Sequence, residues 1–265
     1  MIFTRCVVGL LAVISGASAV AAQDNYEIQV YGSDLVPRGA TMFELHSNFT
    51  TRSGVDLSPG MFSTYHAEHE TLEITHGFTD FFEIGYYNFT SLQPGEGFNW
   101  VGTHLRPRFS VPERWHWPVG VSFSQEFGYQ RKEFSPDTWT WEFRPIVDQK
   151  VGRFYWAINP TLEFSLKGEN SGQGLEFSPN VTVGVDLTHR LNFALEYYGN
   201  FGPLSGFDPV AKTEQELFPA INYDFGPDWE FNLGVGVALT RPTDVVGLKM
   251  ILGRRVGLTT SKSNK

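Results

Sequence analysis

The chain has 265 residues, among them 23 Phe, 10 Tyr and 7 Trp, and its 20 basic and 29 acidic residues give a formal net charge of −9. This acidic balance argues against nucleic acid as a partner. After residue 22 the chain contains no run of about 18 apolar residues, which excludes α-helical membrane spans. The abundance of Phe and Tyr is instead typical of β-strands.

The N-terminus has the pattern of a secretory signal peptide. One early charge, Arg5, precedes an apolar run from Val7 to Ile14 and a stretch of small residues from Ser15 to Ala22. Cys6, the single cysteine, lies before the apolar run, so cleavage would leave a chain without disulfides or thiol chemistry. The predicted division is a signal peptide (1–22), an N-terminal periplasmic segment (23–40), a barrel (41–258) and a polar C-terminal tail (259–265).

Beyond residue 40, apolar and polar residues alternate in twelve short runs, which predicts β-strands with one apolar and one polar face. The runs are 41–50, 65–76, 82–90, 99–111, 119–129, 138–148, 154–166, 176–187, 192–198, 214–225, 229–240 and 244–256. In the first, Phe43, Leu45 and Phe49 share one face, and Glu44 and His46 share the other. An even number of such strands predicts an all-β fold, a transmembrane antiparallel up-and-down β-barrel of about 12 strands.

The connections predict the orientation of this barrel. Connections after the even-numbered runs are short, whereas most of those after the odd-numbered runs are longer and rich in Gly, Pro and Ser. Short turns belong to the periplasmic side and long loops to the outside, so the predicted location is the outer membrane of a Gram-negative-type bacterium. The connection 241–243 is an exception, being short on the long-loop side. Aromatic residues near both strand ends predict two interfacial girdles.

Some features oppose a barrel that spans a membrane. A large soluble β-barrel or sandwich could show the same alternation, although the breadth of the apolar face on nearly every run favours lipid. Five prolines lie inside the runs, where a missing N–H is unfavourable, so we expect bulges or bends at them. They are Pro107, Pro145, Pro160, Pro179 and Pro219.

The polar face carries a predicted band of lumen charges. Pairing the runs about their turns places His104 opposite Glu126, Arg106 and Arg108 near Glu83 and Ser124, Glu126 near Glu142, and Arg144 near Ser124. The band consists of Glu83, His104, Arg106, Arg108, Glu126, Glu142 and Arg144. It could form a constriction that filters solutes by charge, or a salt-bridge network that fills the lumen. Lys249 is expected to pair with Glu44 across the closing seam.

Two further groups contain residue types that are common in catalytic or metal sites. His46 and Ser47 resemble a base and nucleophile, but neighbours on a strand point to opposite faces and cannot react together. His66, Glu68 and Glu70 form a possible cation site at the outer mouth, with ordinary polar strand-end residues as the alternative. We predict no catalytic residues, no bound metal and no cofactor.

The hairpin at residues 73–86 (EITHGFTDFFEIGY), together with residues 229–236 (WEFNLGVG), resembles the hairpins of the outer-membrane transporter family named after the MetA pathway of phenol degradation. The resemblance implies an outer-membrane barrel that moves small compounds, aromatic ones included, and gives no catalytic residues.

The predicted function is therefore a narrow channel or facilitator for small solutes, with hydrophobic or aromatic compounds among the candidates and outer-membrane lipid as the surrounding partner. A structural or partner-binding barrel with a closed lumen is the alternative. A lipid-modifying enzyme is less favoured, because it would need a His and Ser or acid pair on one face near a girdle, and no pair in the sequence is convincing.

Overall fold

The computed structural model describes residues 25–53, 57 and 59–257 of the chain. In that part, thirteen strands form a single sheet. They are β1 (Ala40–Arg52), β2 (Glu68–Gly77), β3 (Phe82–Gln93), β4 (Gly97–Ser110), β5 (Gly120–Gln130), β6 (Asp137–Val151), β7 (Phe154–Gly168), β8 (Leu175–Asp186), β9 (Leu191–Asn200), β10 (Glu214–Tyr223), β11 (Trp229–Gly234), β12 (Val237–Ala238) and β13 (Val245–Gly257). A single 3₁₀ turn, η1 (Glu113–Trp115), lies between β4 and β5.

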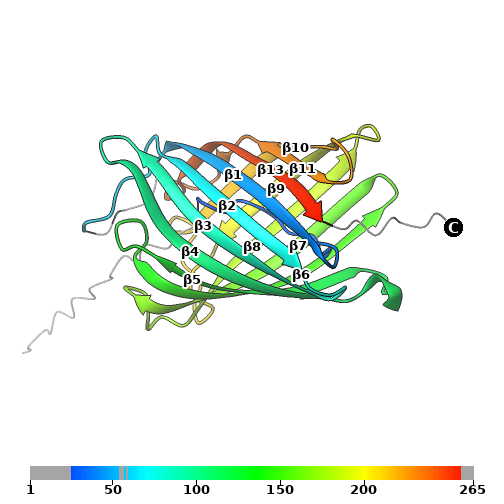
Figure 1. The fold of residues 1–265 in the computed structure, drawn as a ribbon. Coiled ribbons are helices and arrows are strands. Elements are labelled where there is room, and N and C mark those ends of the chain that lie inside the picture. The colour runs from blue at the N-terminus through cyan, green and yellow to red at the C-terminus, as the bar shows by residue number, and fades with distance from the viewer. Residues whose placement is uncertain (1–24, 54–56, 58, 258–265) are drawn as a thin grey trace, which may run out of the picture.

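The sheet closes on itself as an antiparallel barrel. Consecutive strands pair from β1 to β10, and β13 pairs with both β1 and β11. Because β10 pairs with β11 at one end and with β12 further along, β11 and β12 are two pieces of one interrupted strand. The predicted all-β barrel of about 12 strands is therefore confirmed, with the last strand lying beside the first (Figure 1).

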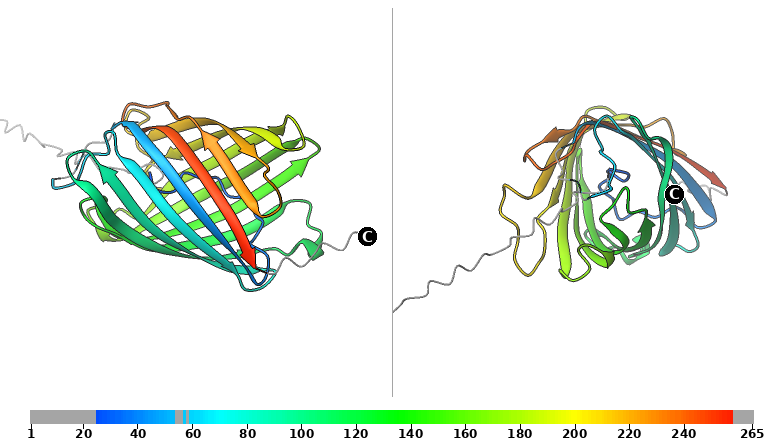
Figure 2. Two further views of the ribbon diagram at one scale, coloured as in Figure 1. Left: turned by 45° about the horizontal axis from the view of Figure 1, so that its top comes forward. Right: turned by 90° about the vertical axis from the view of Figure 1, so that its left-hand side faces the viewer.

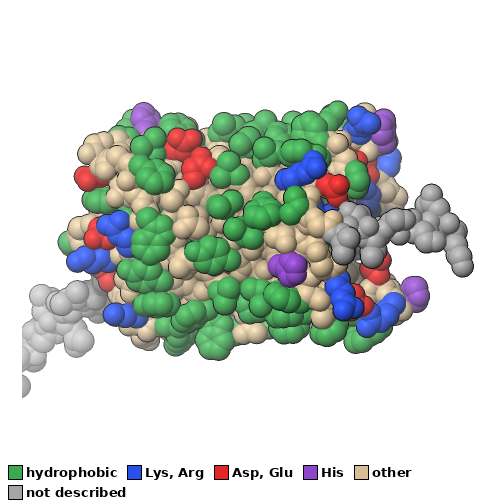
Figure 3. Space-filling model, viewed as in Figure 1, with side chains coloured by type: hydrophobic (Ala, Val, Ile, Leu, Met, Phe, Trp, Pro, Cys, Tyr) green, Lys and Arg blue, Asp and Glu red, His purple; other side chains and the backbone are tan. Residues whose placement is uncertain are grey.

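Alternation along each strand separates an outer face from a lumen face. On β1, Phe43 and Leu45 are exposed, whereas Glu44 and His46 are buried inside. Hydrophobic side chains cover much of the middle of the outer surface, and charged side chains gather toward its two ends (Figure 3). The part of the chain that the structure describes has no helix long and apolar enough to cross a membrane.

The observed strands begin and end close to the predicted runs, with one informative difference at β2. This strand begins at Glu68, because His66 has a backbone φ of 58° and the Ala67 N–H donates to the Thr64 carbonyl. A left-handed backbone at His66 is incompatible with strand geometry. On the long-loop side, the connection expected to be exceptional spans 239–244, whereas 94–96 between β3 and β4 is the shorter one.

Pairing continues in register on either side of the strand prolines, so the expected bulges at these residues are wrong. The pairing is interrupted without a change of register at Pro107 between β4 and β5, and at Pro145 and Pro160 between β6 and β7. A register shift occurs instead between Phe89 and Thr90, where the partner strand skips Val101. This bulge turns Val101 into the barrel, where it is fully buried, although alternation alone places it on the lipid-facing side.

Residues 25–39 do not lie outside the barrel. The sequence predicted a periplasmic segment for 23–40, but this part of the chain runs through the lumen from the long-loop end to the short-turn end, where β1 begins (Figure 2). Asn25 contacts Asn48 near the long-loop end, and the Gly39 N–H donates to the Gly77 carbonyl at the other end. The predicted signal peptide and the polar tail from 259 lie outside the described residues.

Candidate functional site

Side chains of the barrel wall hold the backbone of the N-terminal segment in the lumen. An extended chain has unpaired N–H and C=O groups, and these need partners when buried. Asn159 on β7 donates to the Tyr31 carbonyl at 2.9 Å and accepts from the Tyr31 N–H at 2.8 Å. Thr71 on β2 donates to the Tyr26 carbonyl at 2.6 Å, and Lys249 on β13 donates to the Ile28 carbonyl at 3.1 Å.

The same pattern continues toward the short-turn end. Arg108 donates to the carbonyls of Gly32 and Asp34, and Glu83 accepts from the Val36 N–H at 2.6 Å. The wall polar groups thus replace the missing ladder partners of the segment. Sequence reasoning missed this role, because those side chains are equally suited to lining an open lumen.

Tyr31 lies at the centre of the charged band. The guanidinium carbon of Arg106 is 4.4 Å from the centre of its ring, and that of Arg144 is 4.8 Å away. Its hydroxyl donates to Glu27 and lies 3.2 Å from the Tyr87 hydroxyl. Cation–π contacts of this kind are stabilising when water is excluded.

Glu27 also belongs to the N-terminal segment, and its Oε1 lies 3.3 Å from Arg144 Nη1. The Arg144 guanidinium thus contacts a carboxylate of the segment as well as Glu142 on its own strand, and a buried charge requires such pairing.

The structure brings the predicted charged band together. Glu83 lies opposite Arg108 and contacts its Nε at 2.8 Å, and Arg144 lies opposite Ser124. Glu142 Oε1 is 2.8 Å from Arg144 Nε and lies opposite Glu126. These placements follow from strand parity and turn position, both of which the sequence contains.

Two residues of the charged band, Arg106 and His104, have partners that differ in part from the predicted ones. Arg106 donates to Glu73 at 2.7 Å and lies 3.7 Å from Glu83. His104 lies opposite Gly128, not Glu126, yet its ring contacts Glu126. A Cβ at Gly128 would lie 1.8 Å from the His104 ring, so the glycine leaves the space that this ring occupies.

The expected pairing of Lys249 with Glu44 is wrong. The Lys249 ammonium instead contacts Glu196 on β9 and lies 3.1 Å from the Tyr198 hydroxyl. Its side chain is fully buried and also donates to the Ile28 carbonyl of the segment. A buried cation without a carboxylate would be very unfavourable, and Glu196 supplies that carboxylate.

The lumen also contains two apolar clusters that pack against the segment. Tyr26 packs with Tyr87, Phe89 and Val101, and Phe134 borders this group. Ile28 packs with a second group, formed by Tyr198, Phe218 and Val246. The barrel wall thus provides an apolar contact for Tyr26 and another for Ile28. The sequence of the segment does not by itself indicate that it lies in the lumen.

A cavity lies on each side of the segment. Toward the long loops, a cavity of about 160 Å³ is lined by Tyr26, Glu27, Phe89 and Arg144 among others. Toward the short turns, a cavity of about 560 Å³ is lined by Tyr31, Arg106 and other residues. Glu27 and Arg144 line the first cavity and Tyr31 and Arg106 line the second, so the contacts of Tyr31 with the other three lie between the two cavities.

The cation site predicted at the outer mouth is not part of this lumen. Glu68 is exposed, and Glu70 accepts a hydrogen bond from Ser47 at 2.8 Å on the outer face. His66 lies in the turn before β2 and stacks on Tyr65, with ring centres 3.9 Å apart. The cation site there stays a prediction.

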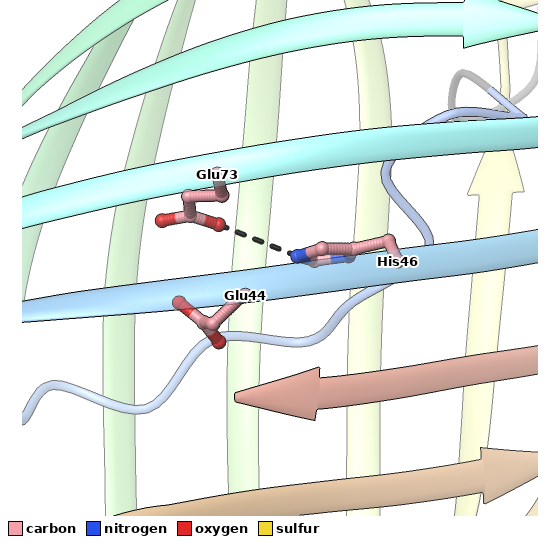
Figure 4. A group of neighbouring side chains, drawn as sticks. All are labelled: Glu44, His46 and Glu73. Atoms are coloured by element: carbon pink, nitrogen blue, oxygen red, sulfur yellow. Dashed lines mark ion pairs between the residues drawn. The ribbon is translucent and has the colours of Figure 1, made fainter. Parts of the chain in front are cut away.

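Ser47 and His46 do point to opposite faces, as strand geometry requires. His46 is fully buried in the lumen, where its Nε2 lies 3.4 Å from Glu73 Oε2 (Figure 4). Within the described ranges, Glu44, His46 and Glu73 form the one group of three His or carboxylate side chains whose potential ligand atoms lie within 4.8 Å of one another.

Comparisons with known proteins found barrels among solved structures. A KdgM porin aligns over 82% of this chain and 99% of its own, with 10% identity and a TM-score of 0.49. LpxR from Salmonella typhimurium aligns over 83% and 100%, with 9% identity and a TM-score of 0.40. OmpF of Salmonella typhi, in complex with daunomycin, aligns over 86% and 99%, with 8% identity and a TM-score of 0.34.

No family model and no curated protein matches the sequence. The resemblance to the phenol-degradation transporter family therefore stays a prediction. Because identities and TM-scores to the solved barrels are this low, what those proteins bind or do is not transferred to this chain. The class defined by the fold is a closed antiparallel β-barrel whose lumen holds its own N-terminal segment.

Proposed function

We propose that this protein is an outer-membrane barrel that lets small solutes pass through a lumen constricted by its N-terminal segment. The observation that supports this most directly is the pair of cavities on either side of Tyr31. One lies toward each end of the barrel, and side chains of the segment line both of them. A barrel of this strand number leaves room for a small path, in contrast to smaller barrels filled by side chains.

The outer surface supports the proposed location. Exposed apolar side chains such as Leu45, Leu72 and Leu252 lie in a row across β2, β1 and β13. An outward apolar band with polar residues inside is the arrangement that a bilayer requires.

The aromatic lining supports solutes with an apolar or aromatic part. Tyr26, Phe62, Phe89 and Phe134 border the cavity on the long-loop side. Pockets that combine aromatic walls with a few polar groups suit small amphipathic molecules. The charged band next to this cavity would then select solutes by their charge.

Planar bilayers containing the purified chain test the proposal. Small, discrete conductance steps are expected, together with flux of small aromatic solutes into vesicles. Heat-modifiable migration on gels would confirm the barrel in the same sample. A correctly folded barrel without conductance or flux would overturn the channel proposal and favour a closed, structural barrel.

A further inference from the structure

Strand pairing brings Glu44, His46 and Glu73 together inside the barrel. Glu44 and His46 are two residues apart on β1, so both side chains point into the lumen. Glu73 lies on β2 directly opposite Glu44. All three are buried, with exposures of 6%, 0% and 0%. Figure 4 shows the His46 ring directed at the Glu73 carboxylate.

His46 Nε2 and Glu73 Oε2 face each other at 3.4 Å as an ion pair, but neither atom makes a hydrogen bond among the described residues. This holds for both ring nitrogens of His46 and for Glu73 Oε2. Buried polar atoms in native proteins nearly always make hydrogen bonds, so two buried ring nitrogens and a carboxylate oxygen without one need an explanation. His46 is completely buried, so bulk solvent does not supply the missing partners.

Glu73 is already oriented by its other oxygen. Its Oε1 accepts from Arg106 at 2.7 Å and from Thr75 at 2.7 Å. Hydrogen bonds of this kind fix a carboxylate while its second oxygen stays available, as outer partners do around metal ligands. The second oxygen, which makes no hydrogen bond, is the one that faces His46.

The separations fit a bound metal ion. Two ligand atoms at roughly 2.0–2.1 Å from a tetrahedral ion lie about 3.4 Å apart, and His46 Nε2 lies 3.4 Å from Glu73 Oε2. One ligand atom from each of the three residues falls within a 4.8 Å group. Glu44 and Glu73 also line the larger cavity, which provides a route for an ion from the short-turn end.

We propose that Glu44, His46 and Glu73 bind a divalent transition-metal ion of the zinc type, with the fourth position directed to the cavity. Imidazole favours such ions, and the two carboxylates add the negative charge that balances a dication. Glu230 lines the same cavity, so its carboxylate is a candidate for the fourth position. The site is separate from the outer-mouth residues around His66, and it does not depend on whether the lumen conducts.

Isothermal titration of the purified, tag-free and chelator-treated chain in detergent with ZnCl₂ tests the site. One ion per barrel is expected. His46→Gln and Glu44→Gln should each weaken binding by more than the roughly 10–100-fold that loss of an outer-shell partner costs. His69→Gln is the matched control, since His69 on β2 is the other fully buried histidine of the described residues and lines the opposite cavity.

Cobalt in place of zinc gives a second signal, a visible ligand-field absorption that should be present in the unaltered chain and lost in His46→Gln. Heat-modifiable migration identifies the variants that fold. If His46→Gln does not fold, Glu44→Gln tests the loss of a ligand in its place. The proposal would be overturned by the absence of stoichiometric zinc binding, by unchanged binding in both ligand variants, or by equal loss in His69→Gln.

Discussion

The Asn159 side chain accepts a hydrogen bond of 2.8 Å from the Tyr31 N–H and donates one of 2.9 Å to the Tyr31 carbonyl. The two bonds replace those that a neighbouring strand would make. One wall residue thus fixes the backbone of the residue whose side chain lies between the two cavities. Each such bond contributes about 0.5–1.5 kcal/mol, and a buried unpaired backbone group costs more.

Replacing Asn159 by Ala should loosen the segment and raise the mean single-channel conductance or its fluctuations. Asn222→Ala is the control, because Asn222 faces the lumen side chains Asn192 and Asn232 and not the segment. Planar-bilayer recordings of both variants measure the effect. Equal conductance in the two variants would mean that Asn159 does not hold the constriction.

Tyr31→Ala should lower the free energy of unfolding by about 2–4 kcal/mol, because a large buried side chain and its cation–π contacts are lost. Tyr31→Phe keeps the ring above Arg106 and Arg144 and removes only the hydroxyl contacts. Its loss should be about 1 kcal/mol. Urea titration of the refolded barrel checks both values, and similar losses in the two variants would argue against a role for the ring.

Arg144→Gln should make the conductance more cation-selective. The substitution leaves Glu27 and Glu142 without their guanidinium partner at the constriction. The reversal potential in a salt gradient measures the change, and Arg144→Lys should keep most of the original value. Removing one member of a buried pair also costs about 3–5 kcal/mol, so folding of each variant must be checked. An unchanged reversal potential in folded Arg144→Gln would show that ions avoid this band.

Leu45→Arg should destabilise the barrel in lipid by about 2–4 kcal/mol, the cost of a cation on the lipid face near the bilayer midplane. Leu187→Arg is the control, because Leu187 lies in the turn between β8 and β9 and is also exposed. Its cost should be about 0–1 kcal/mol. Equal costs measured by refolding into vesicles would argue against the proposed membrane placement.

The twelve strands and the charged band could be predicted because both depend on a period of two. Parity places Glu83 near Arg108 and Glu126 near Glu142 without knowledge of the third dimension. Val101 could not be placed in this way, because one skipped residue at the bulge reverses its face.

The segment in the lumen could not be predicted for a different reason. Its binding depends on side chains from distant strands, such as Thr71, Asn159 and Lys249, which the sequence places far apart. The sequence predicts that Lys249 pairs with Glu44 across the seam between the last and first strands. The ammonium lies elsewhere because Glu196 and the Ile28 carbonyl of the segment bind it.

The conductance of a chain that lacks residues 25–36 tests the central claim most directly. This deletion removes Tyr26, Glu27, Ile28 and Tyr31 and keeps the contact of Gly39 with Gly77 that precedes β1. If the segment constricts a solute path, a variant that retains heat-modifiable migration should show larger and longer-lived conductance steps than the intact chain. Conductance equal to that of the intact chain, in a variant that still folds, would contradict the account.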